Sequence, residues 1–516
     1  SHTQLEFGSE FRTTKLLAPL AGHHPLWPRL QQWLQYGAAF PLQPLQEFER
    51  ISDLKLALAR GNHKSAKNSP HHVNTLLIKE VQRGWQLPLP PEKLLLLPGA
   101  IIAPLGLAEQ ASINDRGEII HKHRITHDQS FNYSGRNSVN ARVIQEQLTP
   151  CVYGTALRRL LHYMAHLRLR HPTRHILLTK LDVKAAYRRI HSNATTALAS
   201  CVIVPPLALM GLRLLFGASP NPSIWSDLSE LLCDLCNQIC RCPLWNASDT
   251  PHLESPHQQK YVPQPTYLPD HIPFASAQNT TVTVPTDDHP YTEVYLDDFI
   301  TCFLDTPHAI WTGSRISLLV LHLFGRPIHS YEPTTRDDLL AFDKTLAEGA
   351  PEEVKTVLGW IINTRSFSLS LPIDKRDTWV TDIHRLLAKP TLTYDDIKST
   401  IGRLNHAAYV IPSARAFLCQ LRRLELHLAR SGKPATPDKG QKDELRHWCY
   451  FLHRASLGIS INLLTYRQPT TFLRADACEH GLGGISINSG AAWRFEIPPP
   501  LRGHLSLNLL EYLASA

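Results

Sequence analysis

The hydrophobic and polar positions divide the chain into stretches with different periods. Residues 1–92 carry apolar residues at helical spacing with polar breaks, as in FERISDLKLALAR (residues 48–60). Over residues 94–140 short apolar runs are separated by Gly and Asn, which predicts strands and turns. We therefore expect a helical N-terminal extension followed by a region that contains sheet.

The middle of the chain alternates between the two periods. A strand is predicted over HILLTKLDV (residues 175–183). Helices are predicted over residues 141–171, 185–200 and 223–240. From residue 241 to 290 Pro, His, Ser and Asn dominate and long apolar runs are missing, which indicates an inserted loop that is at least partly disordered.

The last part of the chain predicts strands, then helices, then strands again. TEVYLDDFI (residues 292–300) is rich in strand formers, and residues 357–371 predict a pair of strands. Helices are predicted over residues 374–430, and SGKPATPDKG (residues 431–440) has the composition of a linker. The final strands are predicted over residues 470–478, 481–489 and 491–497, before a helical pattern in LNLLEYLASA (residues 507–516).

Length and composition add a size class and a weak hint about partners. With 516 residues, of which 43% are hydrophobic, the chain is expected to form two to four domains with substantial cores. Its formal net charge is +8, and 28 histidines add positive charge below neutral pH. A moderate positive excess favours a polyanionic partner such as nucleic acid.

The ten cysteines and the absence of a signal peptide predict reduced thiols in an intracellular protein, cytoplasmic or nuclear. The most apolar run, residues 94–108, is interrupted by Pro98 and Pro104, so no membrane span is predicted. The chain starts at Ser1 without Met and stops inside a helical pattern. We expect a fragment of a longer polyprotein, with further domains after residue 516.

Two adjacent carboxylates, Asp297 and Asp298, interrupt the strand formers of residues 292–300. A hairpin turn tolerates aspartate there, and that is the structural alternative. The functional interpretation needs a third carboxylate to help hold a divalent metal, since Mg²⁺ prefers hard oxygen ligands. Asp182 ends the predicted strand 175–183 and would face a cleft, although a strand-end aspartate is often only a cap. Tyr187 follows five residues later and would line the same pocket.

At these residues the chain resembles the reverse transcriptases. KLDVKAAYRRI resembles their first palm motif, with Asp182 and an aromatic residue at the fifth position, and YLDDF resembles their Tyr-x-Asp-Asp turn. LLFGASPNPSIW is similar to their Phe-Gly-x-x-x-x-Pro motif, and residues 102–140 resemble their fingers. VLGW (residues 357–360) is similar to their primer grip. The residues that match the Phe-Gly-x-x-x-x-Pro motif are Phe216, Gly217 and Pro222. Those that match the fingers are Arg124, Asp128 and Ser130.

The resemblance implies a role for each position. Asp182 and Asp297 would hold metal, assisted by the backbone carbonyl of Val183, and Asp298 would be the supporting acid. Tyr187 would stack under the incoming sugar and exclude a 2′ hydroxyl, so that dNTPs are preferred. The remaining nucleotide contacts would come from Phe216, Gly217, Arg124 and, as a second cation, Lys122. Alternatively, Lys122 and Arg124 are ordinary solvated residues at the edge of a strand.

The C-terminal part resembles the start of a ribonuclease H domain. That family carries an Asp on its first strand and a Glu on its first helix, and Asp476 and Glu511 occupy such positions. Further acids of that family lie later in its sequence, so hybrid-strand cleavage by these 516 residues is doubtful. IGRLNHAAYVIPSARAFLCQL resembles the corresponding stretch of DIRS-type and related long-terminal-repeat retroelements. Candidates for contacts with nucleic-acid phosphates are Arg403, Arg415, Arg422 and Arg423.

The expectation is therefore an α+β fold: a right-hand polymerase with fingers, palm and thumb, followed by a truncated ribonuclease H-like α/β domain. Four regions are expected: 1–92, an N-terminal extension; 93–372, fingers and palm with the insert 241–290; 373–440, thumb and connection; 441–516, partial ribonuclease H. The expected activity is RNA-directed DNA polymerisation of a retrotransposon, with two Mg²⁺ or Mn²⁺ ions, an RNA template, a DNA primer and dNTPs.

Two alternatives stay open. One is a catalytically inactive, nucleic-acid-binding remnant of a retroelement, favoured by the long insert and by LAEQ (residues 107–110), where many relatives carry a lysine. The other is an RNA-dependent RNA polymerase, which Tyr187 and the ribonuclease-like end disfavour. A zinc site is a further alternative to core packing for the cysteines that lie near His252 and His257, namely Cys233, Cys236, Cys240 and Cys242.

Overall fold

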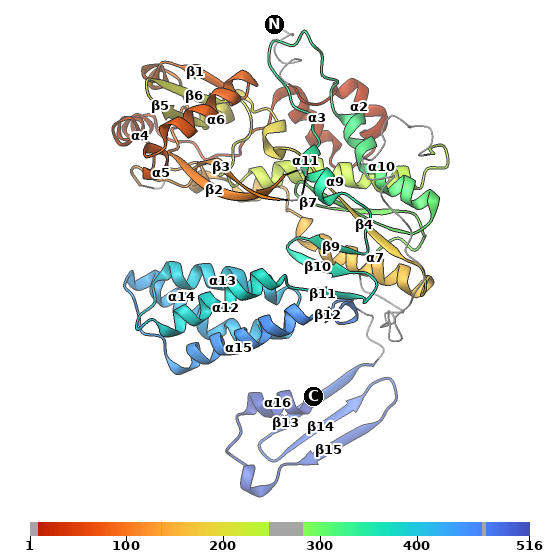
Figure 1. Ribbon diagram of the computed structural model, residues 1–516. Helices are drawn as coiled ribbons and strands as arrows, with labels where there is room; N and C mark the ends of the chain where they lie inside the picture. Colours follow the sequence, from red (N-terminus) through yellow and green to blue (C-terminus); the bar gives the residue numbers. More distant parts are fainter. Residues whose placement is uncertain are drawn as a thin grey trace. The chain divides into compact units, whose positions relative to one another are not determined.

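The computed structural model describes residues 9–114, 116, 118–135, 137–246, 282–466 and 471–515. Helices and antiparallel sheets are mixed along the chain, so the expected α+β class is confirmed (Figure 1). The chain divides into two compact units: among the described residues, 9–246 and 284–464 belong to the first, and 282–283 and 465–515 to the second. The helices of the described part include none that is long and apolar enough to cross a membrane.

The first unit begins with helices and then forms a small sheet. The helices are α2 (Thr14–Ala21), α3 (Trp27–Tyr36), α4 (Glu47–Arg60), α5 (Lys64–Lys67) and α6 (Pro70–Gln82). The strand β1 (Gln86–Leu89) pairs with β6 (Leu207–Gly211), which also pairs with β5 (Cys201–Val204). The end of the expected extension 1–92 therefore belongs to a sheet whose other strands come from much later in the chain.

A long antiparallel hairpin follows. Its strands are β2 (Leu105–Ile113) and β3 (Ile119–His127), with Leu105 opposite His127. The first predicted helix of the middle region is shorter than expected: only α7 (Ala156–Arg170) is α-helical. Pro150 lies in the part that does not continue the helix, as its missing N–H explains.

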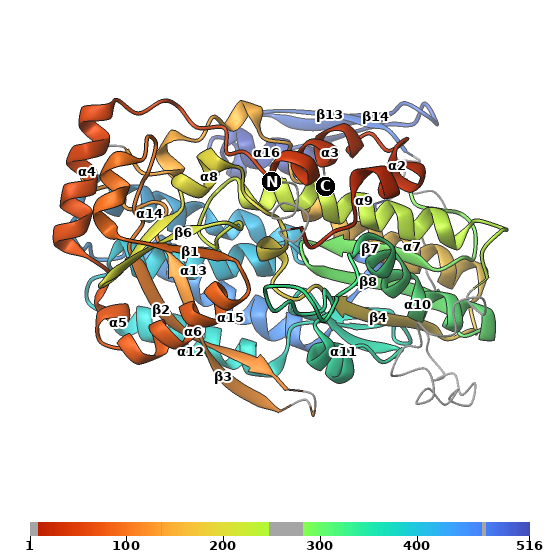
Figure 2. The same cartoon turned by 90° about the horizontal axis from the view of Figure 1, so that it is seen from above.

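The central sheet has the order β4-β8-β7, and its strands are β4 (Ile176–Asp182), β7 (Tyr291–Tyr295) and β8 (Asp298–Leu304). Helices α9 (Asn221–Cys240) and α10 (Pro307–Phe324) pack on it, as Figure 2 shows from above. Alternate side chains of β8 point to opposite faces. Thus Ile300 and Cys302 join the core that contains α7, while Phe299 joins the core of α9 and α10.

The helix expected over residues 185–200 is interrupted. Residues 186–189 form one helical turn and α8 spans Ala194–Leu198. Between them the backbone pairs elsewhere: Ala38 donates to His191 at 2.8 Å, and Ser192 donates to Leu212 at 2.9 Å. Tertiary hydrogen bonds thus replace the helical ones at this point.

The rest of the first unit consists of a second sheet and a helical bundle. The sheet has the order β12-β11-β10-β9, with strands β9 (Val354–Val357), β10 (Trp360–Asn363), β11 (Ser368–Ser370) and β12 (Ile459–Ser460), and it follows the short helix α11 (Phe342–Glu348). The bundle contains α12 (Ile373–Ala388), α13 (Tyr394–Ala408), α14 (Cys419–Ser431) and α15 (Lys439–Leu457) (Figure 1).

The second unit is a three-stranded antiparallel sheet with one helix. The order is β13-β14-β15, with β13 (Leu473–Cys478), β14 (Gly481–Ser486) and β15 (Ala492–Glu496), and α16 (Leu507–Ser515) packs on β13. The strand, strand, strand, helix order is the predicted one. The expected boundary at residue 441 falls inside α15, whose buried Leu445, Trp448 and Leu452 pack in the bundle core, so this helix belongs to the first unit.

Candidate active site at the end of the central sheet

The three acidic residues singled out from the sequence meet at one end of the central sheet. Asp182 is the last residue of β4 and lies opposite Asp298, the first residue of β8. Asp297 lies in the turn between β7 and β8, and its carbonyl accepts a hydrogen bond from the amide of Val183 at 3.0 Å. Strand pairing thus brings together carboxylates that are more than 100 residues apart in sequence.

The turn that carries Asp297 is held by a helix. Leu296 has a positive φ of 54° in this turn, a conformation that is unfavourable for a side chain of its size. The indole Nε1 of Trp225 on α9 donates a hydrogen bond to the carbonyl of Leu296 at 2.8 Å. Since Trp225 is only 1% exposed, its indole is held in the core between α9 and the central sheet and thereby fixes the turn.

The other edge of β4 is held at the same level by a segment that precedes α11. The amide of Lys184 donates to the carbonyl of Leu339 at 2.8 Å, and the amide of Ala341 donates to the carbonyl of Asp182 at 2.9 Å. Val183 and Leu340 form the bridge between these two bonds. The backbone of Asp182 is therefore fixed from both sides, by β8 and by residues 339–341.

Two lysines approach the carboxylates. The ammonium group of Lys344 on α11 forms an ion pair with Asp182. Lys180, two residues before Asp182 on the same face of β4, lies 3.4 Å from Asp298 and 3.1 Å from Glu348. These two cations offset part of the negative charge that gathers at the end of the sheet.

Burial and mutual repulsion disfavour the charged form of all three acids. Burial raises the pKa of Asp182, and Asp297 raises it further. Burial likewise raises the pKa of Asp297, with Asp298 adding to it, and the pKa of Asp298, with Asp182 adding to it. Burial alone would lower the pKa of Lys180, but Asp298 and Glu348 raise it overall. Such a cluster is favourable for binding cations.

The donor set suits a hard divalent cation, although it does not form a closed cage. Among the residues that the structure describes, no three His, Cys, Asp or Glu side chains are arranged to hold a metal ion by themselves. Mg²⁺ is usually bound by one or two protein carboxylates together with water and substrate phosphates. Asp182 and Asp297, with Asp298 beside them, fit that incomplete type of site.

The residues predicted to line the nucleotide pocket lie together. Tyr187 and Phe216 are in an edge-to-face contact, with ring centroids 5.2 Å apart, and Phe216 is 42% exposed. Gly217 has a φ of +109°, and a Cβ there would lie 2.0 Å from the carbonyl oxygen of His127. Asn140 donates to the carbonyl of Gly217 at 2.8 Å. Burial raises the pKa of Tyr187, and Tyr153 and Asp297 raise it further.

The two predicted cations of the hairpin are exposed. Lys122 and Arg124 lie on the same face of β3, opposite Gln110 and Ala108. Within the described part of the chain neither forms an ion pair. The strand β2 contacts α11, the helix that carries Lys344. The hairpin therefore lies next to the Lys344 side of the acidic site.

The predicted primer-grip residues form the turn between β9 and β10, with positive φ at Leu358 and Gly359. The four arginines predicted to contact nucleic-acid phosphates differ in how many other contacts they make. Arg403 forms an ion pair with Asp382, and Arg422 donates to Asn405 at 2.9 Å. Arg423 donates to Gln420, and Arg415 is exposed.

Asp476 and Glu511 belong to the second unit. Asp476 is exposed on β13 opposite Gly483, and Glu511 is partly exposed on α16, the helix that packs on β13. The cysteines Cys233, Cys236 and Cys240 are buried on α9 and belong to its hydrophobic core, while Cys242 is half-buried. His252 and His257 lie outside the described residues.

Sequence reasoning missed several residues that shape the site. Lys180 could have been found, because a strand places residues i and i+2 on the same face. Lys344 is 162 positions from Asp182, and no local pattern indicates their contact. Trp225 resembles any other apolar residue of a helix until its indole is seen to bind the turn.

No protein-family model and no curated protein matches the chain. Solved structures that resemble it include the foamy viral protease-reverse transcriptase dRH in complex with double-stranded DNA (TM-score 0.44, 10% identity, 98% of this chain and 72% of the other). The same enzyme in complex with an RNA/DNA hybrid gives a TM-score of 0.44 at 12% identity, over 99% of this chain and 54% of the other. At this level of similarity, function has to be argued from the residues of the chain itself.

Proposed function

We propose that the chain is an RNA-directed DNA polymerase that extends a DNA primer on an RNA template with dNTPs. The observation that supports this proposal most directly is the meeting of Asp182, Asp297 and Asp298 at the end of the central sheet. In this proposal the β2–β3 hairpin and its helices are fingers, the central sheet is the palm, and the bundle α12–α15 is the thumb.

The three carboxylates would hold two Mg²⁺ or Mn²⁺ ions together with the triphosphate. When bound, such ions supply the positive charge that activates the primer hydroxyl and stabilises the leaving pyrophosphate. The chain itself contributes the fixed positions of Asp182 and Asp297, which two sets of backbone hydrogen bonds and the Trp225 anchor maintain. Asp298 would be the supporting acid beside them, and Lys180, 3.4 Å from Asp298, offsets part of the negative charge.

Substrate selection follows from the aromatic contact. The ring of Tyr187 packs against Phe216. It would lie beneath the sugar, where it would leave no room for a 2′ hydroxyl. The exposed cations of β3, Lys122 and Arg124, would bind phosphate oxygens. Four arginines of the bundle region would contact the backbone phosphates of the template and primer, namely Arg403, Arg415, Arg422 and Arg423.

The second unit would be the beginning of a ribonuclease H domain, with Asp476 and Glu511 as its first two metal ligands. The sheet order and the helix on β13 are compatible with this proposal. A DIRS-type or related retroelement is the proposed origin, based on residues 401–421.

Primer extension on poly(rA)/oligo(dT) with Mg²⁺ tests the proposal. The wild-type protein is compared with Asp297→Asn and with Asp305→Asn as a matched control. Asp305 follows β8 at the end opposite to the site, so its substitution removes the same charge without touching the acids. We expect Asp297→Asn to lower the rate by about a thousandfold or more, on the scale of lost electrostatic stabilisation, and Asp305→Asn to retain the wild-type rate.

Each other result would contradict the proposal in a specific way. Equal signal in wild type and Asp297→Asn would mean that a different site or a contaminant carries the reaction. No extension by any of the proteins, together with normal binding of the duplex, would favour a catalytically inactive remnant. Incorporation of rNTPs in place of dNTPs would favour an RNA polymerase and would remove the role assigned to Tyr187.

A further inference from the structure

A cluster of charged side chains in the protein interior is centred on Glu10. It includes Arg189, which lies seven residues after Asp182. The carboxylate of Glu10, which is 1% exposed, contacts the guanidinium groups of Arg189 at 3.2 Å and Arg336 at 3.5 Å. A third guanidinium, of Arg213, lies 4.0 Å away. Arg189 and Arg213 are buried, and the side chain of Arg336 is only 3% exposed, so Glu10 balances charge in the protein interior.

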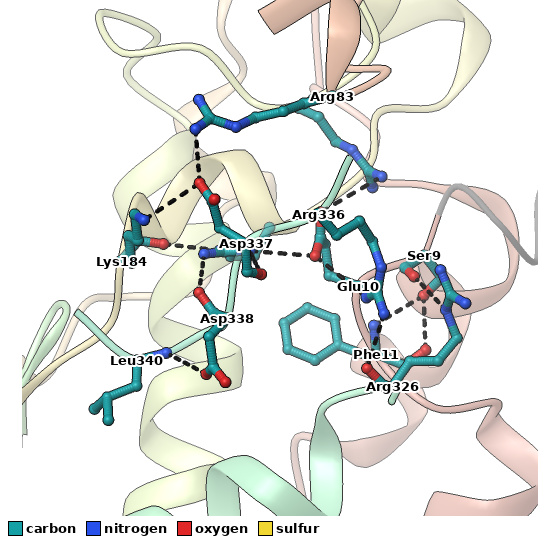
Figure 3. Close-up of polar contacts among 12 residues, drawn as sticks. Ser9, Glu10, Phe11, Arg83, Lys184, Arg326, Arg336, Asp337, Asp338 and Leu340 are labelled. Atoms are coloured by element: carbon teal, nitrogen blue, oxygen red, sulfur yellow. Dashed lines mark hydrogen bonds and ion pairs between the residues drawn. The ribbon is translucent and has the colours of Figure 1, made fainter. Parts of the chain in front are cut away.

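The backbone around Glu10 is fixed as well. Phe11 forms an antiparallel bridge with Gly325 at the end of α10, and the amide of Arg326 donates to the carbonyl of Glu10 at 3.0 Å. The guanidinium of Arg326 donates to the carbonyl of Ser9 at 2.9 Å (Figure 3). The N-terminal segment is therefore held in place beside the end of α10, and the position of the Glu10 carboxylate is defined.

Arg189 transmits this position to two other segments. Its Nε donates to the carbonyl of Lys184 at 2.7 Å. Its two Nη atoms donate to the carbonyls of Asp337 at 3.0 Å and Asp338 at 2.5 Å. A planar guanidinium donates in fixed directions, so its orientation sets the positions of all three carbonyls.

These carbonyls belong to the segments that hold Asp182. Lys184 pairs with Leu339, and Ala341 donates to the carbonyl of Asp182 itself. The side chain of Asp337 adds ion pairs to Arg83 at 2.8 Å and to Lys184 at 3.3 Å (Figure 3). Directly after this segment, α11 presents Lys344 to Asp182. The contacts therefore form a continuous path from Glu10 to the acidic site.

From this path we infer that Glu10, acting through Arg189, is a positioning residue for the proposed polymerase site. It holds residues 337–341 against the end of β4 and thereby sets the geometry of Asp182 and Lys344. The inference rests on the proposed function for its catalytic consequence. Its physical content, the coupling of Glu10 to residues 337–341, holds independently of any activity.

Neutralising Glu10 tests the coupling because the arginines then lose their shared counter-charge. A buried charge without a partner is strongly unfavourable, so Arg189 is expected to reorient and release the carbonyls that it holds. The matched control is Glu332→Gln. The side chain of Glu332 is only 2% exposed, and it binds Arg336 at 2.7 Å and Arg326 at 3.0 Å. Among the contacts described, it makes none with Arg189.

Hydrogen exchange measures the coupling directly. In Glu10→Gln the amides of Lys184 and Ala341 are expected to exchange about tenfold faster, as a locally loosened segment does, while amides inside β4 and β8 keep the wild-type rate. Glu332→Gln is expected to leave Lys184 and Ala341 unchanged. Unchanged exchange in Glu10→Gln, or equally faster exchange throughout the central sheet, would overturn the inference.

A second measurement gives the functional consequence. The Mg²⁺ concentration for half-maximal primer extension is expected to rise about tenfold in Glu10→Gln, the scale found for residues that orient metal ligands, and Glu10→Asp should recover part of it. An unchanged Mg²⁺ requirement would overturn the positioning role. If the wild-type protein extends no primer, the proposed function fails, and hydrogen exchange still decides the coupling.

Arg189→Lys keeps the inference testable if Glu10→Gln does not fold. Lysine retains the positive charge beside Glu10, but it cannot donate to three separate carbonyls in the fork geometry of a guanidinium. The same two amides should exchange faster, with the charge of the cluster unchanged. Wild-type exchange at Lys184 and Ala341 in this variant would refute the path through Arg189.

Discussion

Gly217→Ala perturbs the candidate nucleotide pocket in a way whose size follows from the structure. The new Cβ would lie 2.0 Å from the carbonyl oxygen of His127, whereas ordinary contact begins at 3.4 Å. The loop and the end of β3 would therefore have to separate by 3.4 − 2.0, or about 1.4 Å. The φ of +109° adds strain, since residues with a side chain rarely adopt it.

The expected cost has two parts. A strained backbone conformation costs about 1–3 kcal/mol, and forcing atoms into a packed contact costs about 1–3 kcal/mol more. Gly99→Ala separates the two, because Gly99 has a φ of +82° but a methyl group added there would have nothing within 4 Å. We expect Gly217→Ala to lower the free energy of unfolding by about 2 kcal/mol more than Gly99→Ala does.

Chemical unfolding followed by tryptophan fluorescence measures the stability difference, and dNTP titration in primer extension measures the effect on the pocket. A displacement of about 1 Å near the reacting groups is expected to lower kcat/KM for dNTPs by about a hundredfold. The reasoning is refuted if the two alanine variants unfold with the same free energy, or if Gly217→Ala binds and uses dNTPs as the wild type does.

Three further outcomes are expected. First, without divalent metal the free energy of unfolding should fall as pH rises above about 4: the raised pKa values of the three acids mean that the folded protein binds more protons than the unfolded chain. Mg²⁺ should abolish part of this slope, and urea unfolding with and without EDTA across pH measures it; a metal-independent slope would contradict it. Second, Trp225→Phe should cost about 1 kcal/mol by removing the bond to Leu296 and should slow primer extension, whereas a wild-type rate would show that the turn needs no anchor. Third, Arg415→Ala should weaken duplex binding and reduce its salt dependence by about one counterion, more than Arg403→Ala, whose guanidinium already pairs with Asp382; fluorescence anisotropy at several salt concentrations decides, and equal losses would count against this distinction.

Local patterns predicted elements well where the local signal and the tertiary contacts agree. The apolar strand ending at Asp182, the helix α9 and the strands β13–β15 were all indicated by period and composition. The helix expected over residues 185–200 failed where His191 and Ser192 bond to other segments. The boundary expected at residue 441 failed because α15 follows a linker-like stretch and yet completes the core of the bundle.

The candidate site shows the same division. The acids were found because adjacent aspartates among strand formers are unusual, and because a known motif order connected them with Asp182. Lys344 and the path from Glu10 were not found, since an ordinary charged residue gives no local signal of a distant partner. Such contacts depend on which chain segments fold against one another, and a period of 2 or 3.6 residues carries no information on that.

By itself the sequence determined the mixed class of the chain, the strand that ends at Asp182 and the turn that carries Asp297. Only the tertiary structure decided that these two elements pair, that two lysines offset their charge, and that Glu10 balances three arginines behind them. The physical reason is range: backbone preference and side-chain period act over a few residues, whereas burial and ion pairing act between segments that only folding brings together.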